Sequence, residues 1–305
     1  MNFYKKIIKS KKMRFKILSA MRFIPDKQML ELQYYIKHKR KLNLKNPQRY
    51  TEKLQWYKLY YRDAKMQQCA DKYRVREYIE SKGLGAILNE LYAVYETPEE
   101  ITLENLPEKF VMKSNNGSGT NLICKDKSLY TNEQVREMFR GFFAQSSASA
   151  GREWVYGGIS PVIIAEKLLE DPAQADGSIC DYKFLCFNGK PAYVVYDVDR
   201  FSEHKRNIYD TEWNDLHVAT DCPCAEKVYD KPENLTEMLE IARILSADFP
   251  AVRVDLYSIA GKIYFGELTF FPWSGYVQYT PDSFDFEAGE KFVLPGKNNE
   301  SGLSV

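Results

Sequence analysis

Apolar positions along the chain change from helical spacing to strand-like runs and back, which predicts a protein built from both helices and strands. Five runs of β-branched and aromatic residues are typical of strands, at 109–113, 121–125, 162–167, 181–187 and 191–197. Apolar residues three and four apart predict helices near 26–42, after Asn46-Pro47, and over 71–81, 132–143 and 236–247. The last of these helices stands just before a predicted β-hairpin.

The predicted hairpin carries two acidic residues. Its strands contain Arg253-Val254-Asp255 and Gly266-Glu267-Leu268-Thr269, joined at Ala260-Gly261-Lys262. A three-residue loop at this point pairs Ile259 with Ile263. Counting back by twos then places Asp255 opposite Glu267, with Cβ atoms about 5 Å apart, and Arg253 opposite Thr269. Like charges so close repel one another, so the pair is either a divalent-cation site or a solvated edge.

Charge is distributed unevenly along the 305 residues, although the net charge is only +1. Residues 1–62 carry 18 Lys and Arg against 3 Asp and Glu, a net of +15, and the remainder carries a net of −14. Apolar positions within residues 3–24 repeat with helical spacing among lysines, up to Ile24-Pro25-Asp26. Two interpretations stay open: this basic helix lies on an anionic membrane surface, or it docks on the protein itself.

Composition and cysteine use indicate an ordered globular protein of the cytoplasm. Hydrophobic residues make up 44% of the chain and aromatic residues 14%. We find no signal peptide and no apolar run of about 20 residues, so we expect the six cysteines to be reduced thiols. Cys222-Pro223-Cys224 lacks a second pair of ligands, which argues against zinc. An aromatic stripe at Leu54, Trp56, Tyr57, Tyr60 and Tyr61 predicts a helix that packs in the core.

Three motifs upstream of the hairpin are suited to binding a nucleotide. A strand ends at Lys113 and runs into Gly117-Ser118-Gly119, where backbone N–H groups can approach an anion. A second strand meets Glu166-Lys167 and then Leu168-Leu169, and a third opens with Asp181-Tyr182-Lys183, whose two charged side chains share a face. Taken singly, each also fits an ordinary hairpin turn, strand end or solvated face.

A fourth motif is an Asp-x-Asp pattern followed by a basic cluster. Asp197-Val198-Asp199-Arg200 precedes His204-Lys205-Arg206. Two acids at this spacing fit a metal-dependent glycosyltransferase that uses a nucleotide sugar. The basic cluster fits an anionic substrate or an exposed loop. With only three histidines and no Ser/His/Asp or Cys/His constellation, a histidine-based mechanism is not expected.

Taken in order, these motifs resemble the TupA-like branch of the ATP-grasp superfamily, which is associated with teichuronopeptide biosynthesis. The resemblance covers roughly residues 45–290 and also includes Glu153-Trp154 with Tyr156. It implies an α+β, ATP-grasp fold in which two α+β lobes sandwich the nucleotide, to which the charge pattern adds a basic helical N-terminal extension. One departure is Thr269, where many ATP-grasp enzymes have asparagine, because a hydroxyl is a poorer Mg²⁺ ligand than an amide oxygen.

The resemblance also implies roles for individual residues. Lys113 and Arg253 are expected to be catalytic, and Asp255, Glu267 and Thr269 to bind one or two Mg²⁺ ions. Substrate is expected at Asp199, Arg200, Lys205 and Arg206. ATP is expected to be bound by Lys113, Gly117, Ser118, Gly119, Glu166, Lys167, Leu168, Leu169, Asp181 and Lys183.

The implied reaction is an ATP-dependent carboxylate–amine ligation through an acyl phosphate. The expected partners are a carboxylate, such as a uronic acid or amino acid, an amine, and a lipid- or nucleotide-linked glycan of the bacterial surface. Contact with an anionic membrane through residues 1–24 is one further expectation, and no nucleic-acid partner is expected. A phosphotransferase on the same fold, an Asp-x-Asp glycosyltransferase and a non-catalytic scaffold are the alternatives.

We expect five segments along the chain. They are a basic helical extension at 1–62, a small α/β subdomain at 63–108, a lid subdomain with the glycine-rich loop at 109–165, a C-terminal subdomain with the metal hairpin at 166–294, and a flexible tail at 295–305.

Overall fold

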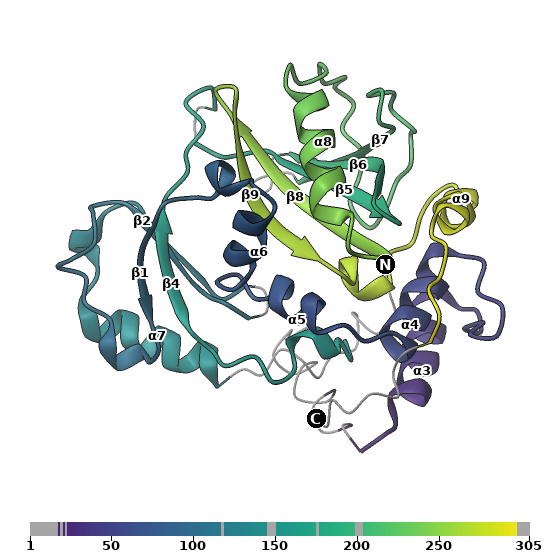
Figure 1. Cartoon of the computed structure of the whole chain (residues 1–305), viewed down its shortest axis with the longest axis horizontal. Helices are drawn as coiled ribbons and strands as arrows, with labels where there is room; N and C mark the ends of the chain where they lie inside the picture. Colours follow the sequence, from purple (N-terminus) through teal and green to yellow (C-terminus); the bar gives the residue numbers. More distant parts are fainter. Residues whose placement is uncertain are drawn as a thin grey trace.

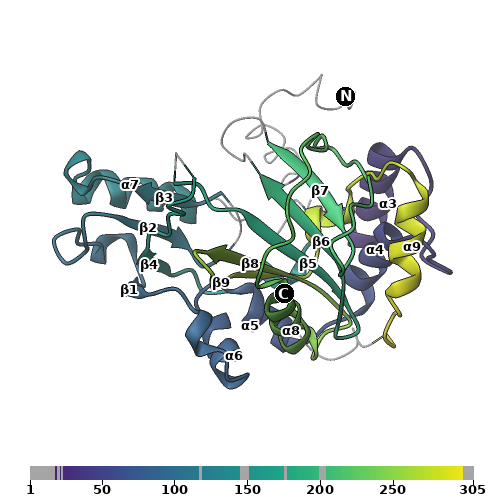
Figure 2. The ribbon, with the colours of Figure 1, turned by 90° about the horizontal axis from the view of Figure 1, so that it is seen from above.

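Two antiparallel sheets lie side by side at the centre of the molecule (Figures 1 and 2). The structure is a computed structural model that describes residues 18, 21, 23–116, 119–144, 151–174, 177–198 and 204–297. Each of the five strands predicted from the sequence is present, with bounds that differ by at most one residue. The protein is therefore an α+β protein with two lobes, each built around one sheet.

The smaller lobe contains a four-stranded sheet in the order β1-β4-β2-β3. Its strands are β1 (Leu91–Tyr95), β2 (Phe110–Ser114), β3 (Asn121–Cys124) and β4 (Ile163–Lys167). Helix α7 (Asn132–Phe143), predicted with these bounds, packs Val135 and Phe139 against one face. Thr131 begins this helix, because its hydroxyl accepts a hydrogen bond from the backbone N–H of Gln134. The opposite face of the sheet, away from α7, carries Lys113 and Glu166.

The larger lobe contains a five-stranded sheet in the order β7-β6-β5-β8-β9. Its strands are β5 (Asp181–Phe187), β6 (Lys190–Val198), β7 (Lys205–Tyr209), β8 (Ala251–Ile259) and β9 (Lys262–Thr269). Helix α8 (Leu235–Ser246) covers one face, where the Cys186 Sγ lies 3.9 Å from the carbonyl oxygen of Ala242 (Figure 1). Side chains alternate along strands, so the charged residues of β5, β6 and β8 share the face away from α8.

Helices from the two ends of the chain gather at one end of the larger sheet (Figure 2). They are α3 (Asp26–His38), α4 (Tyr50–Tyr60) and α9 (Ser283–Lys291). Leu54 and Tyr57 of α4 are fully buried, and Trp56 nearly so, which confirms the prediction that this aromatic stripe packs in the core. Tyr60 and Tyr61 of the same stripe stay partly exposed. Helix α4 is therefore part of the main hydrophobic core.

Several expectations for the helices were wrong in detail. Helix α3 ends at His38 instead of residue 42, because Lys39 adopts a left-handed conformation with φ 58°. The helix expected over 71–81 begins only at Val75, as α6 (Val75–Ser81), and the sequence had not predicted the helix before it, α5 (Ala64–Ala70). The Asp71 carboxylate separates them by accepting hydrogen bonds from the backbone N–H groups of Tyr73 and Arg74.

Some elements had no prediction from the sequence. They are β1, β7, α5, α9 and the short 3₁₀ turns η1 (Gly85–Ile87), η2 (Pro98–Glu100), η3 (Lys127–Leu129), η4 (Trp154–Tyr156) and η5 (Pro272–Gly275). The basic helix expected at 3–24 and the tail expected from 295 lie almost wholly outside the described residues. Among the helices of the described ranges, none combines the length and apolar character that a bilayer span requires.

Candidate active site

Asp255 and Glu267 lie directly opposite one another on β8 and β9, as the sequence predicted, and Arg253 lies opposite Thr269. The group between the two acids is the guanidinium of Arg253. Its Nε and NH2 atoms each donate to one oxygen of Asp255 at 2.7 Å. The NH2 group also donates to Glu267 Oε1 at 3.0 Å and to Thr269 Oγ1 at 3.1 Å. Repulsion between the carboxylates is thus offset by a cation of the same strand pair.

The turn that joins these strands differs from the expected three-residue loop. Ile259 pairs with Lys262, so the loop is the two residues Ala260 and Gly261, with φ 48° and 79°. These positive φ angles are typical of the tight hairpin turn that matches the twist of the strands. The shorter loop shifts the register by one residue, and a bulge at Gly266 shifts it back between Leu256 and Asp255. The expected pairing of the acids is correct because two deviations cancel.

Burial and charge act in opposite directions on the two acids. Burial raises the pKa of Asp255, which is 3% exposed, despite the opposing charges of Arg253 and Lys183. Burial also opposes ionisation of Glu267, but Arg253, Lys72 and Lys183 together lower its pKa below the usual range. The site therefore holds one carboxylate with a raised pKa, Asp255, and one with a lowered pKa, Glu267.

Lys183 extends the charged row across β5. Its ammonium lies 2.7 Å from Asp181 Oδ2, 3.6 Å from Asp255 Oδ2 and 3.7 Å from Asp197 Oδ2. Lys183 and Asp181 are 6% and 1% exposed, so the lysine is buried among three carboxylates. The structure therefore brings these two residues beside the acid pair of the hairpin.

On the smaller sheet, Lys113 and Glu166 form a second charged pair. Lys113 Nζ lies 2.7 Å from Glu166 Oε2, and Arg76 NH1 lies 3.2 Å from Glu166 Oε1. The register pairs Glu166 with Val111, and Lys113 is two residues after Val111 on β2. Glu166 and Lys113 therefore lie on the same face of the sheet, the one away from α7. Lys167 alternates to the other side of β4 and is exposed, and Leu168 and Leu169 follow it at half-buried positions.

A pocket joins the two lobes at these groups. Its lining combines Lys113 and Glu166 with Phe265 and Gly266 of β9, and with residues of α6 and the segment after it, Val75, Arg76, Leu88 and Asn89. An adjoining pocket is lined by Cys69, Ala70, Tyr156, Glu267 and Leu268. Lys72, Val75 and Gly266 line both pockets, so the pocket lined by Glu267 adjoins the pocket lined by Lys113 and Glu166.

Lys72 is a candidate site residue that the sequence reasoning missed. It lies in the turn between α5 and α6, and its backbone N–H donates to the carbonyl oxygen of Asn115 at 3.0 Å. Asn115 is buried, and its amide donates to Asp71 Oδ2 at 2.8 Å. Burial lowers the pKa of Lys72, while Glu267 acts in the opposite direction. A lysine in an interhelical turn has no distinctive spacing, and its preceding Asp71 was the one available signal.

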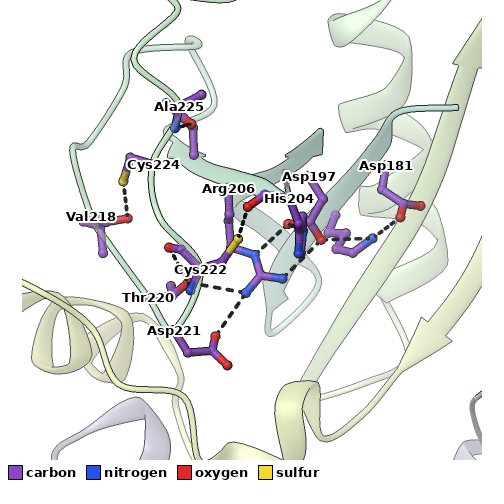
Figure 3. A network of polar contacts seen from close by, with 12 residues as sticks. Asp181, Asp197, His204, Arg206, Val218, Thr220, Asp221, Cys222, Cys224 and Ala225 are labelled. Carbon is purple, nitrogen blue, oxygen red and sulfur yellow. Dashed lines mark hydrogen bonds and ion pairs between the residues drawn. The ribbon is translucent and has the colours of Figure 1, made fainter. Parts of the chain in front are cut away.

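The strands β6 and β7 carry a further network, drawn in Figure 3. Arg206 donates to Asp197 through Nε at 2.7 Å and NH2 at 3.3 Å. His204 Nε2 lies 3.2 Å from the same carboxylate. Although burial opposes it, the hydrogen bond and charge of Arg206 lower the pKa of Asp197 to about 2. Both Asp197 oxygens therefore serve an internal ion pair, which does not favour a nucleotide-sugar site at this residue.

The other predicted substrate residues are placed only in part. Lys205 alternates with Arg206 and faces the other side of β7. Asp199, Arg200, Gly117 and Ser118 lie outside the described residues, and Gly119 has a positive φ of 77°. All six cysteines are free. The Cys222 thiol lies 3.1 Å from the carbonyl oxygen of His204, and the Cys224 thiol lies 3.7 Å from that of Val218 (Figure 3).

The hairpin offers suitable oxygen ligands for Mg²⁺ in Asp255, Glu267 and the Thr269 hydroxyl. Four of their oxygen atoms accept hydrogen bonds from the guanidinium of Arg253, three of them from its NH2 group, so they already converge on one cation. Across the described ranges, no cluster of three or more His, Cys, Asp or Glu side chains is suited to a metal. The residues thus fit a two-carboxylate site, in which Arg253 would have to yield part of its contacts.

Solved structures with some likeness to this chain have low sequence identity. An ATP complex of D-alanine–D-alanine ligase from Bacillus anthracis is 15% identical with a TM-score of 0.39, over 66% of this chain and 53% of that one. The corresponding ligase from Helicobacter pylori is 15% identical with a TM-score of 0.40, over 74% and 61%. L-amino acid ligase from Bacillus licheniformis is 18% identical with a TM-score of 0.39, over 73% and 46%.

The chain thus matches 46–61% of the length of these ligases, and TM-scores this low decide nothing about its activity. No curated protein matches the sequence significantly. The model of the sequence family TupA-like ATPgrasp matches residues 52–293. This range includes both sheets and all the charged residues of the candidate active site. The chain belongs to the TupA-like ATPgrasp family.

Proposed function

We propose that this protein is an ATP-dependent carboxylate–amine ligase that acts through an acyl phosphate. The observation that supports this most strongly is the pair of adjoining pockets between the lobes. One is lined by Lys113 and Glu166, the other by Glu267, and Lys72 lines both. A nucleotide triphosphate needs cations on several sides, and a carboxylate attacking it needs its own charge neutralised.

In this proposal the smaller lobe and the strand β5 hold ATP. Lys113 and the loop at 117–119 contact phosphates, Glu166–Leu169 meets the adenine, and Asp181 with Lys183 contacts the ribose and phosphate. Lys167 would need to turn toward the pocket to reach a phosphate, because it is exposed on the other side of β4. Asp255, Glu267 and Thr269 would hold Mg²⁺, which supplies charge neutralisation at the phosphates.

Arg253 has the central role in the chemistry. A carboxylate oxygen of the first substrate bonds to the γ-phosphorus as the bond to ADP breaks. The amine of the second substrate then bonds to the acyl carbon, and phosphate leaves. Each step builds negative charge on oxygen, and the guanidinium of Arg253 is held by Asp255 and Glu267 where such charge would develop. No protein nucleophile is required.

The proposed substrates are an amine, such as an amino acid, and a uronic acid of a bacterial surface polysaccharide or its precursor. This choice is supported by the family and by the basic N-terminal segment, with a net of +15 over residues 1–62. Lipid-linked glycan precursors lie at an anionic membrane surface, where each basic residue adds roughly 1 kcal/mol of attraction. We infer a cytoplasmic enzyme that contacts this surface through residues 1–24. Deletion of these residues should then abolish binding to anionic vesicles.

ADP release tests the proposal directly. The full chain is incubated with Mg-ATP and pairs drawn from amino acids and uronic acids. The proposal expects ADP and phosphate only when both substrates are present, and a hydroxamate when hydroxylamine replaces the amine. A stable phosphorylated sugar formed without amine would instead indicate a phosphotransferase. ATP turnover that persists in the double variant Asp255→Ala, Glu267→Ala would contradict the proposed site.

A further inference from the structure

The turn that follows β9 has an unusual backbone. Trp273, Ser274 and Gly275 of η5 all have positive φ angles, of 50°, 55° and 66°. Residues with a side chain rarely adopt this conformation, and two in succession persist only where the surroundings hold them. The turn comes directly after the strand that carries Glu267 and Thr269, so its conformation bears on the site.

Two side chains of α4 hold this turn. Gln55 Nε2 donates to the carbonyl oxygens of Ser274 at 3.0 Å and Gly275 at 2.9 Å. Lys58 Nζ donates to the Ser274 carbonyl oxygen at 2.8 Å and to that of Gly151 at 3.0 Å. Gln55 and Lys58 are three apart, on one face of the helix, and are 0% and 1% exposed. Lysine side chains are rarely buried, so a buried Lys58 that donates to two backbone carbonyl groups is unusual.

A side chain just before η4 contacts the same turn. The Ser274 hydroxyl donates to the carboxylate of Glu153, which is beside η4 and its Tyr156. A Cβ atom at Gly275 would lie 2.4 Å from Gln55 Nε2, so the approach of α4 requires glycine here. The turn is therefore held on one side by Gln55 and Lys58 of α4 and on the other by Glu153, which precedes η4.

The fixed turn presents Trp273 to two arginines. The Cζ atom of Arg253 lies 5.2 Å from the centre of the indole, and that of Arg206 lies 4.6 Å from it. Both guanidinium groups are buried, at 7% and 5% exposure, so cation–π attraction is stronger than at a solvated site. The aromatic ring thus links the β6–β7 network to the Arg253 cluster, in addition to Lys183, whose ammonium lies 3.7 Å from Asp197 and 3.6 Å from Asp255.

We propose that Trp273 is a positioning residue of the ligase site, which fixes the direction of the Arg253 guanidinium and is itself held in place by Gln55 and Lys58 of α4. This inference rests on the proposed function for its catalytic consequence, because Arg253 acts on the reacting oxygens there. Helix α4 would then contribute to the site indirectly, because it holds Trp273 in place. A merely structural turn would affect stability and leave Arg253 in place.

The test compares Trp273→Leu, which removes the ring, with Trp273→Phe, which keeps an aromatic face. Phe286→Leu is the matched control, because its ring lies 4.0 Å from the Cζ of Arg49, far along the chain from Arg253. The first readout is the NMR signal of the Arg253 Nε–H group in the full chain, assigned with Arg253→Lys. The second is kcat and KM for ADP release, with Mg-ATP affinity measured by calorimetry.

We expect Trp273→Leu to shift and broaden the Arg253 signal and to lower kcat by about tenfold or more, since misplacing a catalytic group has effects of this size. KM for ATP should change little, and Trp273→Phe should recover most of kcat. Gln55→Ala should move the same NMR signal. An unchanged Arg253 signal in Trp273→Leu, or an equal loss of kcat in Phe286→Leu, would overturn the proposal. Failure of the wild type to release ADP would overturn the proposed function, and the NMR signal would still decide the role of Trp273.

Discussion

Gly266 approaches Asp255 so closely that a Cβ atom on it would lie 2.9 Å from the carbonyl oxygen of Asp255. This glycine is the bulge that returns Glu267 to its position opposite Asp255. The pairing of the two acids therefore depends on a residue without a side chain next to one of them.

Gly266→Ala should destabilise the protein by about 1–3 kcal/mol, because the backbone of β8 or β9 must shift to admit the methyl group. It should also weaken any cation binding by the two acids. Denaturant unfolding measures the first effect. The matched control is Gly141→Ala in α7, where a Cβ atom meets nothing within 4 Å. A helix-interior glycine of this kind should gain roughly 0.5–1 kcal/mol as alanine. Equal effects of the two substitutions would contradict the bulge argument.

Arg253→Met removes the cation that separates Asp255 and Glu267. We expect a loss of about 3 kcal/mol in EDTA, because a buried charge pair then lacks one partner. Mg²⁺ should restore more stability to this variant than to the wild type, since the ion replaces the missing charge. Thermal unfolding with and without Mg²⁺ measures both quantities.

The control for that comparison is Arg243→Met, which removes an exposed arginine paired with Glu240 at 2.6 Å. Exposed pairs contribute within about 1 kcal/mol, so this variant should behave like the wild type. If Mg²⁺ fails to stabilise Arg253→Met, then Asp255 and Glu267 do not form the metal site.

Lys72 lines both pockets between the lobes, which predicts a direct effect on nucleotide binding. Lys72→Met should weaken Mg-ATP binding by about tenfold, the equivalent of one lost charged contact of about 1.4 kcal/mol. Calorimetry measures the dissociation constant. Lys65→Met is the control, because Lys65 pairs with Asp248 at 2.9 Å and is 44% exposed. Equal affinities for the two variants would remove Lys72 from the site.

The buried His38 at the end of α3 should make the free energy of unfolding decrease in acid. Burial, with the nearby charges of Arg40 and Arg49, lowers the pKa of His38 from 6.5 to about 4. As the pH falls from 6.5 to about 4, the unfolded chain binds a proton that the folded chain does not, so stability decreases. The loss of unfolding free energy amounts to about 3–4 kcal/mol at most, once the pH is below both pKa values. His38→Phe should lessen the difference between urea unfolding midpoints at neutral pH and about pH 5. An undiminished difference would assign the acid sensitivity to other groups.

The sequence predicted the parts of the fold that depend on local patterns. Helix α7 has the predicted bounds, because Thr131 and Gln134 define its start and its apolar stripe is regular. Strand β7 was missed, since Lys205 and Arg206 were interpreted as a basic cluster that binds an anionic substrate or lies in an exposed loop. The partner that buries Arg206 is Asp197 on the neighbouring strand, and such a pairing is set by tertiary structure.

The sequence predicted the position of the two acids of the candidate site, but only some of its cationic residues. The pairing of Asp255 with Glu267 followed from strand register, although the turn behind it was wrong. The group between these acids is Arg253, which a pattern of single residues cannot reveal, because its side chain must turn along its own strand to reach them. Lys72 and Trp273 entered the site through contacts between distant segments, with Asn115 and α4 respectively.

The central claim is that a carboxylate is activated by phosphoryl transfer before an amine attacks it. Labelling the carboxylate substrate found in the ADP-release screen with ¹⁸O tests this step most directly. The phosphate released in the complete reaction should carry one labelled oxygen, because the acyl phosphate breaks between carbon and that oxygen. Phosphate that contains no label, released at the same rate as ADP, would contradict the ligase mechanism.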